Sequence, residues 1–315
     1  MSGFEVLQAR GVSLIQDKGR FGYQHLGITH SGALDEESYL YANLILQNSY
    51  DASVLEIFAS GLKLLAHKNT IICITGAKFD IELNEKRISS YKAISMQVGD
   101  TLHFTKQHSA LRAYLAVKHG FCIAQELGSS SVALKEKLGG LNGGMIQKGD
   151  VLPFMKNKEN HTAPAFFQSL HPKFVPNYSQ ELTLRIVLGY QEEHFSKEAL
   201  ENFFSSTFHA TNDMNRMGAK LTASTPIECN IKGIISEGIA FGAVQIMPDG
   251  NVTVLLKDRQ TIGGYPKIGS VLPFDCFRLA QTTPFSILRF EAISLENAQA
   301  KMKKFYSFFR NANSY

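Results

Sequence analysis

The segment LKDRQTIGGYPKIGSV, residues 256–271, gathers more donors, acceptors and flexible backbone than a simple strand connection requires. Asp258 and Arg259 supply opposite charges, and the adjacent Gly263 and Gly264 let the backbone approach a ligand closely or adopt positive φ. Amides in such a loop suit a carboxylate or a phosphate. The alternative is an internal ion pair between Asp258 and Arg259 that only fixes the loop. The remaining candidate ligand-contacting residues of the segment are Gln260, Thr261, Tyr265, Pro266 and Lys267.

Two further segments carry side chains suited to proton transfer or anion binding. In RFGYQHLGITHSGALD, residues 20–35, the candidates are His30, Ser31 and Asp35, because a histidine beside a carboxylate can shuttle protons. A solvated or backbone-bonded histidine is the alternative. In TNDMNRMGAKL, Asn215 precedes Arg216, whose planar guanidinium matches a carboxylate or a phosphate. A structural salt bridge competes with that interpretation.

The composition and the absent motifs exclude several classes of protein. A formal charge of only +4, with Lys and Arg scattered, argues against a nucleic-acid-binding protein. The sequence has no P-loop, no dinucleotide-binding glycine motif at a helix start and no G-x-S-x-G elbow. Its four cysteines are far apart, and the sequence lacks the close pairs of Cys or of His that a zinc site needs, which predicts reduced, buried thiols and no metal site. The start lacks a signal-peptide pattern, and the longest strongly apolar run, residues 71–74, is far shorter than the roughly 20 residues of a membrane span. We therefore expect a cytoplasmic protein without a membrane span.

The pattern along the chain predicts a mainly β protein of two domains. Residues 1–155 contain short apolar stretches separated by Gly, Asn, Asp and Lys, which is the spacing of a barrel or a sandwich, and one helix is expected after Ser31 and Gly32. Residues 156–181 contain three prolines and no periodicity, so we interpret them as a linker. Residues 182–315 form the second predicted domain, with a helix capped by Ser196 and a C-terminal helix within 294–309.

Short internal echoes suggest that the two domains are related. The string GDTLHF at 99–104 resembles GDVLPF at 149–154, and QDKGRFGY at 16–23 loosely mirrors KDRQTIGGY at 257–265. Such short matches arise easily in β proteins, so they suggest pseudo-symmetry without proving it.

At these segments the chain resembles the biotin-dependent carboxyltransferase-like family, which includes the C subunit of 5-oxoprolinase, the KipA-type proteins and the second subunit of allophanate hydrolase. The resemblance runs nearly end to end. It is carried by IQDKGRFGYQHLGITHSGALD, VLEI, ITGA, GGLNGG, RIVLG, NRMG, SEGIAFGAVQIMPDG and DRQTIGGYPKIGSV.

The resemblance implies two cyclophilin-like β-barrel domains related by pseudo-symmetry, a few short helices and a site between the domains. It also implies work with two partner proteins, one of the KipI type and one of the LamB/YcsF type, which together hydrolyse 5-oxo-L-proline to L-glutamate at the expense of ATP. Phosphorylation of the lactam oxygen would activate the ring for attack by water. In this mechanism Arg216 and Arg259 would hold phosphate or carboxylate and Asp258 would accept a proton or anchor the amide, with Tyr265 as a further catalytic candidate. The amides of Gly263 and Gly264 would face a developing oxyanion.

Two other functions stay open. Relatives transfer a carboxyl group from carboxybiotin to urea or a similar amide, although this sequence contains no A-M-K-M biotin-carrier motif. A KipA-type protein would instead sequester a KipI-type kinase inhibitor without catalysis. Three departures from the family pattern bear on the site: the loop Gly128-Ser129-Ser130-Ser131-Val132 stands where the family has G-S-R-S-T, His30 where Pro is common, and Tyr190 where Pro is usual. The missing Arg and Thr weaken the case that the 128–132 loop binds a ligand.

Overall fold

The computed structural model describes residues 3–155, 169–179 and 181–312, so most of the predicted linker, residues 156–168 and 180, lies outside the described residues. The chain divides into two compact units. The first contains Met1–Phe21, Ser31–Tyr178 and Phe308–Tyr315, and the second contains Gly22–His30 and Ser179–Ser307. The N-terminal segment Gly22–His30 thus belongs to the second unit, and the C-terminal segment Phe308–Tyr315 belongs to the first. Local sequence patterns do not reveal such an assignment.

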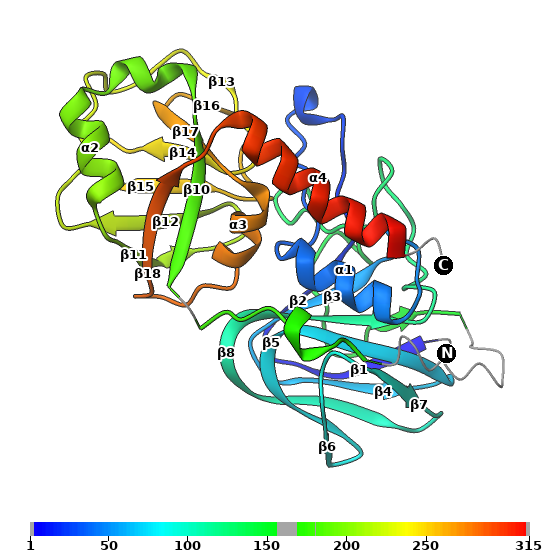
Figure 1. Cartoon of the computed structure of the whole chain (residues 1–315). Coiled ribbons are helices and arrows are strands. Elements are labelled where there is room, and N and C mark those ends of the chain that lie inside the picture. The colour runs from blue at the N-terminus through cyan, green and yellow to red at the C-terminus, as the bar shows by residue number, and fades with distance from the viewer. Residues whose placement is uncertain (1–2, 156–168, 180, 313–315) are drawn as a thin grey trace. The chain divides into compact units, whose positions relative to one another are not determined.

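The first unit is built on one curled sheet, the lower part of Figure 1. Among the described residues the sheet has nine strands, and its main path runs β2-β3-β8-β4-β1-β9, with β5 paired to β6, β7 and β8. The strands are β1 (Gly3–Ala9), β2 (Val12–Gln16), β3 (Val54–Phe58), β4 (Leu62–Ala66), β5 (Thr70–Leu83), β6 (Lys86–Ile88), β7 (Ala93–Met96), β8 (Thr101–Val117) and β9 (Val151–Pro153).

Two strands of this sheet are longer than the sequence pattern indicates. The stretches TIICITGA and FDIEL form the single strand β5, and TLHFTK joins ALRAYLAV in β8. The two strands pair along nearly their whole length with register shifts near Gly76, Lys78 and Asp80. Such bulges bend the strands, so a pair this long can curl around the core that Phe4, Leu64 and Phe104 help to fill.

Helix α1 (Glu36–Ile45) follows the turn at Ser31 and Gly32, as predicted. Both turn residues have positive φ, 53° and 92°. All ten helical residues are buried, so the helix is enclosed on every side rather than along one stripe. The predicted stripe of Leu40, Leu44 and Ile45 is therefore only part of its buried surface.

The second unit contains a closed barrel, in the order β10-β17-β14-β15-β12-β11-β18 (Figure 1). First and last strands of the barrel, β10 and β18, pair in parallel and close it. The strands are β10 (Leu182–Leu188), β11 (Phe208–Met214), β12 (Gly218–Ala223), β14 (Ala243–Ile246), β15 (Val252–Leu255), β17 (Lys267–Val271) and β18 (Ile287–Ala292), while β13 (Glu237–Gly238) and β16 (Ile262–Gly263) form a separate pair. The predicted mainly β class is confirmed, and the two units differ in that one sheet closes and the other is a half-barrel.

The helices of the second unit are α2 (Lys197–Ser205) and α3 (Pro273–Leu279), with one-turn 3-10 helices at Gln24–Leu26 and Tyr190–His194. Ser196 caps α2 through a 3.1 Å bond from the Ala199 amide, as predicted. The C-terminal helix α4 (Leu295–Ala312) has 18 residues and is longer than the short helices that the family resemblance implies. Its Phe305 packs on Phe274 of α3 in the second unit, with ring centroids 5.4 Å apart.

The cysteines are only partly as predicted. All four are free; Cys73 and Cys276 are buried, but Cys122 is exposed and Cys229 is intermediate. No group of His, Cys, Asp and Glu among residues 3–155, 169–179 and 181–312 could hold a metal ion. Within the same residues, no helix has the length and apolar character needed to cross a membrane.

Candidate active site

The tip of the β11–β12 hairpin presents Arg216 toward the segment that follows β15. Asn215 shapes this tip. Its side-chain Oδ1 accepts a 2.8 Å bond from the backbone amide of Met217, and its backbone amide donates to the Gly218 carbonyl at 3.0 Å. Two backbone bonds then join the tip to the other segment: the Leu256 amide donates to the Met217 carbonyl at 2.8 Å, and the Asp258 amide to the Arg216 carbonyl at 2.9 Å. Asn215, a predicted ligand contact, therefore shapes the turn.

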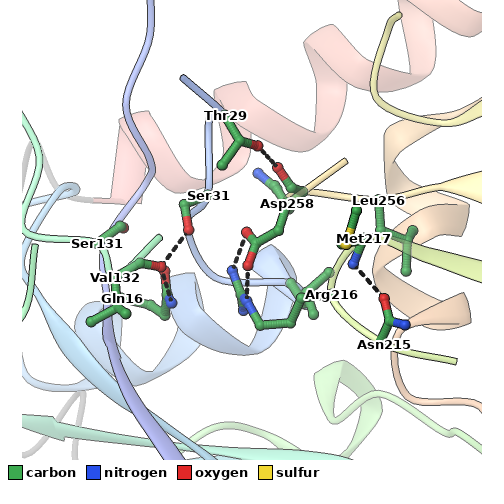
Figure 2. A network of polar contacts seen from close by, with 12 residues as sticks. Gln16, Thr29, Ser31, Ser131, Val132, Asn215, Arg216, Met217, Leu256 and Asp258 are labelled. Carbon is green, nitrogen blue, oxygen red and sulfur yellow. Dashed lines mark hydrogen bonds and ion pairs between the residues drawn. The ribbon is translucent and has the colours of Figure 1, made fainter. Parts of the chain in front are cut away.

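Arg216 and Asp258 form a two-pronged ion pair, drawn in Figure 2. The Arg216 Nε lies 2.7 Å from Asp258 Oδ2, and Nη2 lies 3.0 Å from Oδ1. Both side chains are about nine-tenths buried, with 10% and 11% exposed. The sequence-based alternative of an Asp258–Arg259 pair names the wrong arginine, because neighbouring side chains leave this turn in different directions.

Arg259 is buried, and its hydrogen-bond partners are backbone carbonyls. Its Nε donates to the Ile239 carbonyl at 3.0 Å and its Nη1 to the Leu256 carbonyl at 3.2 Å, and only 2% of the residue is exposed. Burial lowers the pKa of Arg259 to about 10, which still leaves it charged at neutral pH. On the other side of Asp258, Lys257 is 6% exposed, and its Nζ lies 5.2 Å from the centre of the Phe241 ring, a cation–π distance.

The segment before α1 brings His30 to these cations. Thr29 Oγ1 donates to the Lys257 carbonyl at 2.8 Å and so fixes this segment (Figure 2). Burial, the Arg259 charge and the Lys257 charge lower the pKa of His30 from 6.5 to about 4. The ring is therefore neutral at neutral pH and offers one acceptor nitrogen and one donor nitrogen. Burial is the largest cause of this lowered pKa, and the Arg259 and Lys257 charges add to it.

The glycines of the 256–271 segment serve packing rather than unusual backbone angles. Neither Gly263 nor Gly264 has positive φ. A Cβ atom on Gly263 would lie 2.3 Å from Ile239 Cδ1 and 2.9 Å from Gln245 Nε2, so no side chain fits there. The predicted positive φ was wrong. The groups that closely approach the Gly263 backbone in the structure are the side chains of Ile239 and Gln245. The carbonyls of Thr261, Gly264 and Pro266 accept backbone bonds from Ile239, Ile234 and Ile246, while Gln260 is half-buried and Tyr265 is 37% exposed.

Lys267 belongs to a second polar group of this unit. Its Nζ lies 2.7 Å from Glu237 Oε1. The same carboxylate oxygen accepts a 2.7 Å bond from Gln191 Nε2, and Tyr190 donates its hydroxyl to the other oxygen. Gln191 Oε1 in turn accepts the Lys267 amide at 2.8 Å. Tyr190, noted as a departure from the family pattern, thus contributes a hydrogen bond that proline lacks.

Ser31 and Asp35 belong to the first unit, where both have structural partners. Ser31 Oγ donates to the Val132 carbonyl at 2.5 Å, and Gln16 Nε2 donates to the same carbonyl at 3.1 Å (Figure 2). Asp35 caps α1, because its Oδ1 accepts the Ser38 amide at 3.1 Å, and Tyr178 donates to its Oδ2 at 2.6 Å. Asp35 is fully buried, so its role here is that of a helix cap.

The 128–132 loop has a structural partner of its own. Asp17 is 3% exposed, and its Oδ1 accepts bonds from the Ser129 and Ser131 hydroxyls at 2.7 and 2.6 Å and from the Gly19 amide at 2.8 Å. Its Oδ2 accepts the Ser130 amide and hydroxyl at 2.7 and 3.0 Å. The loop therefore surrounds a buried carboxylate, which agrees with the doubt that it binds a ligand.

The second unit thus brings together one part of the predicted site and adds residues that the sequence did not single out. Arg216, Asp258, Arg259 and His30 form one group, and Lys257 and Thr29 complete it. The sequence analysis did not name Lys257 as a candidate, although it precedes Asp258 directly. A basic residue on each side of this acid could have indicated it. Glu237 and Gln191 were also missed, although Glu237 lies in the SEGIAFG motif and Gln191 directly follows Tyr190, the noted departure from the family pattern.

Residues 26–292 match the family model described as carboxyltransferase domain, subdomain A and B. Among curated proteins, the chain is 29% identical to the C subunit of 5-oxoprolinase from Haemophilus influenzae over 95% of this chain and 94% of that protein. It is 30% identical to the C subunit of 5-oxoprolinase from Escherichia coli over 93% and 92% of the two chains. Among solved structures it is similar to the K. lactis urea amidolyase, with a TM-score of 0.90, 26% identity and coverage of 98% of this chain but 20% of that one.

Proposed function

Because the chain belongs to the family of carboxyltransferase domains with subdomains A and B, we propose that it is one subunit of an enzyme complex that hydrolyses 5-oxoproline to glutamate at the expense of ATP. Two relatives that match over nearly their whole length are named as the C subunit of 5-oxoprolinase. The proposed partners are a KipI-type protein and a LamB/YcsF-type protein, and the expected compartment is the cytoplasm.

The observation that carries this proposal is the pair of buried cations beside Asp258. Arg216 pairs with Asp258, the buried cations Lys257 and Arg259 flank the same residue in the chain, and His30 stays neutral at neutral pH. Buried cations favour an anionic ligand, because desolvated cations attract an anion more strongly than exposed ones do. 5-Oxoproline carries a carboxylate, whereas urea is neutral.

In this proposal each residue has a separate task. Lys257 and Arg259 bind the carboxylate of the substrate or a phosphate group of ATP. Asp258, held in place by Arg216, accepts a hydrogen bond from the lactam N–H. His30, whose ring is neutral at neutral pH, orients the attacking water through a hydrogen bond. ATP supplies the activation of the amide carbonyl; the residues of this chain hold and orient the reacting groups.

The test uses the purified chain mixed with its two proposed partner proteins. Glutamate release that requires both ATP and 5-oxoproline supports the proposal. Lys257→Met should lower this turnover about 100-fold, because it removes one charge from the anion site. Lys232→Met, at an exposed position of the same unit, is the matched control and should keep turnover. Bicarbonate- and biotin-dependent carboxylation of urea, with no glutamate release, contradicts the proposal.

The second candidate function is carboxyl transfer from biotin to urea or a related small amide. The likeness to the K. lactis urea amidolyase favours it. A separate biotin carrier would have to deliver the carboxyl group. Tight partner binding without either turnover would instead support the regulatory, KipA-type function.

A further inference from the structure

A cavity of the barrel unit lies beside the start of α4. Its volume is about 520 Å³, within the range of about 300–1,000 Å³ that small-molecule sites usually have. Most of its wall is apolar. Val187 and Leu188 come from β10, Phe241 from the turn before β14, and Leu295, Ala298 and Met302 from α4.

One end of this cavity is polar and carries one charge of each sign. Glu237, Lys267, Tyr190 and Gln191 line it. Hydrogen bonding to Lys267 and to Tyr190 lowers the pKa of Glu237, so the carboxylate is ionised at neutral pH. Because a lysine ammonium has three donors and a carboxylate about four acceptor sites, the 2.7 Å contact between Lys267 and Glu237 leaves donor and acceptor capacity on both.

We propose that this cavity binds a small neutral molecule with an amide head and an apolar body. The Lys267–Glu237 pair is electrically balanced, so it attracts neither an anionic nor a cationic head in preference to a neutral one. An amide matches both members, since its carbonyl accepts from Lys267 and its N–H donates to Glu237. The apolar wall contacts an aliphatic or aromatic body. Neither 5-oxoproline nor urea has such a body, so the inference does not rest on the proposed function.

The test compares three probes with the same chain and different heads: octanamide, octanoate and octylammonium. Titration calorimetry on the full chain should give a dissociation constant for octanamide at least about tenfold lower than for either charged probe. Equal or tighter binding of octanoate or octylammonium overturns the neutral head, and no binding of any probe overturns the site.

Two variants on α4 locate the binding. Ala298 lines the cavity and is 5% exposed, whereas Ala300 on the same helix is exposed. Ala298→Phe should weaken octanamide binding at least about tenfold, and Ala300→Phe should leave it unchanged. Unchanged binding in Ala298→Phe overturns the assignment. If that variant fails to fold, an octanamide analogue bearing a diazirine should cross-link the wild-type chain within residues 295–302, and labelling elsewhere overturns it.

Two further variants test the charge balance. Glu237→Gln removes the negative charge, so octanoate should become the tightest probe. Lys267→Gln removes the positive charge, so octylammonium should become the tightest. If octanamide remains the tightest probe in both variants, the role given to the ion pair is contradicted. Tightest binding of octylammonium to Glu237→Gln, or of octanoate to Lys267→Gln, contradicts it as well.

Discussion

The segments that begin at Gln16 and at Lys257 are sequence echoes of each other, yet the two units use them differently. In the first unit Asp17 is surrounded by neutral donors, three serine hydroxyls and two amides, and Lys18 points outward with 43% of its side chain exposed and Asp51 3.5 Å away. In the second unit Asp258 pairs with an arginine, and the basic residues on both sides of it are buried.

In the proposed function this difference separates a structural from a functional use of the same pattern. Around Asp17 the serines satisfy the buried carboxylate, and the buried Arg20 donates to the Ser129 and Ser131 carbonyls of the same loop. Around Asp258 the partner is Arg216, and the buried Lys257 and Arg259 on either side of it favour an anion in this proposal. An acid followed by a basic residue therefore does not by itself identify a site.

The largest expected effect is on stability, at Asp17. Asp17→Ala should lower the free energy of unfolding by about 3–4 kcal/mol, because three hydroxyls and two amides lose a charged acceptor inside the protein. Urea unfolding measures the change. Asp51→Ala removes the partner of Lys18 and the acceptor of the Ser49 hydroxyl, both at the surface, and should cost less than about 1 kcal/mol. Equal losses in both variants would remove the distinction.

The next effect is on turnover, at Asp258. Asp258→Asn should reduce glutamate release by the assembled complex about 100-fold, because Arg216 loses its charged partner and the lactam its acceptor. Asp213→Asn, on the exposed side of the same hairpin, serves as control. Full activity of Asp258→Asn in the assembled complex removes Asp258 from the mechanism.

A smaller effect is expected within the serine loop. Ser130→Ala should cost about 1 kcal/mol of unfolding free energy, because Asp17 Oδ2 loses one hydroxyl and keeps the Ser130 amide. The same urea experiment measures it. A loss as large as that of Asp17→Ala would mean that the five donors act as one indivisible network.

The last effect appears only at acidic pH and is a pH dependence at His30. Its folded pKa of about 4 lies below the ordinary value of 6.5. As the pH falls from about 6.5 toward 4, the unfolded chain takes up a proton at this residue that the folded chain does not, so the free energy of unfolding decreases. His30→Gln should flatten this decrease, and His209→Gln, at an exposed position, should not. An identical slope in His30→Gln and wild type contradicts the burial of a neutral ring beside the two cations.

The sequence predicted those features that depend on near neighbours. The start of α1 after Ser31 and Gly32 and the cap at Ser196 are examples, since both rest on residues a few positions apart. The mainly β class and the family followed from whole motifs. The sequence-based prediction failed where partners are distant in the chain. Arg216 lies 42 residues from Asp258, and the serines lie more than 110 residues from Asp17. Charges alone do not reveal which of two arginines an aspartate selects, because the choice depends on how the strands bring their loops together.

The parallel pairing of β10 with β18 also determines when the barrel of this unit can close during synthesis. It joins residues 182–186 to residues 288–292, with Leu182 opposite Leu288. At about 5–20 residues per second, a ribosome needs roughly 5–20 s to produce the intervening chain. Throughout that interval the edge of β10 stays without its partner strand and is open to pairing with another chain.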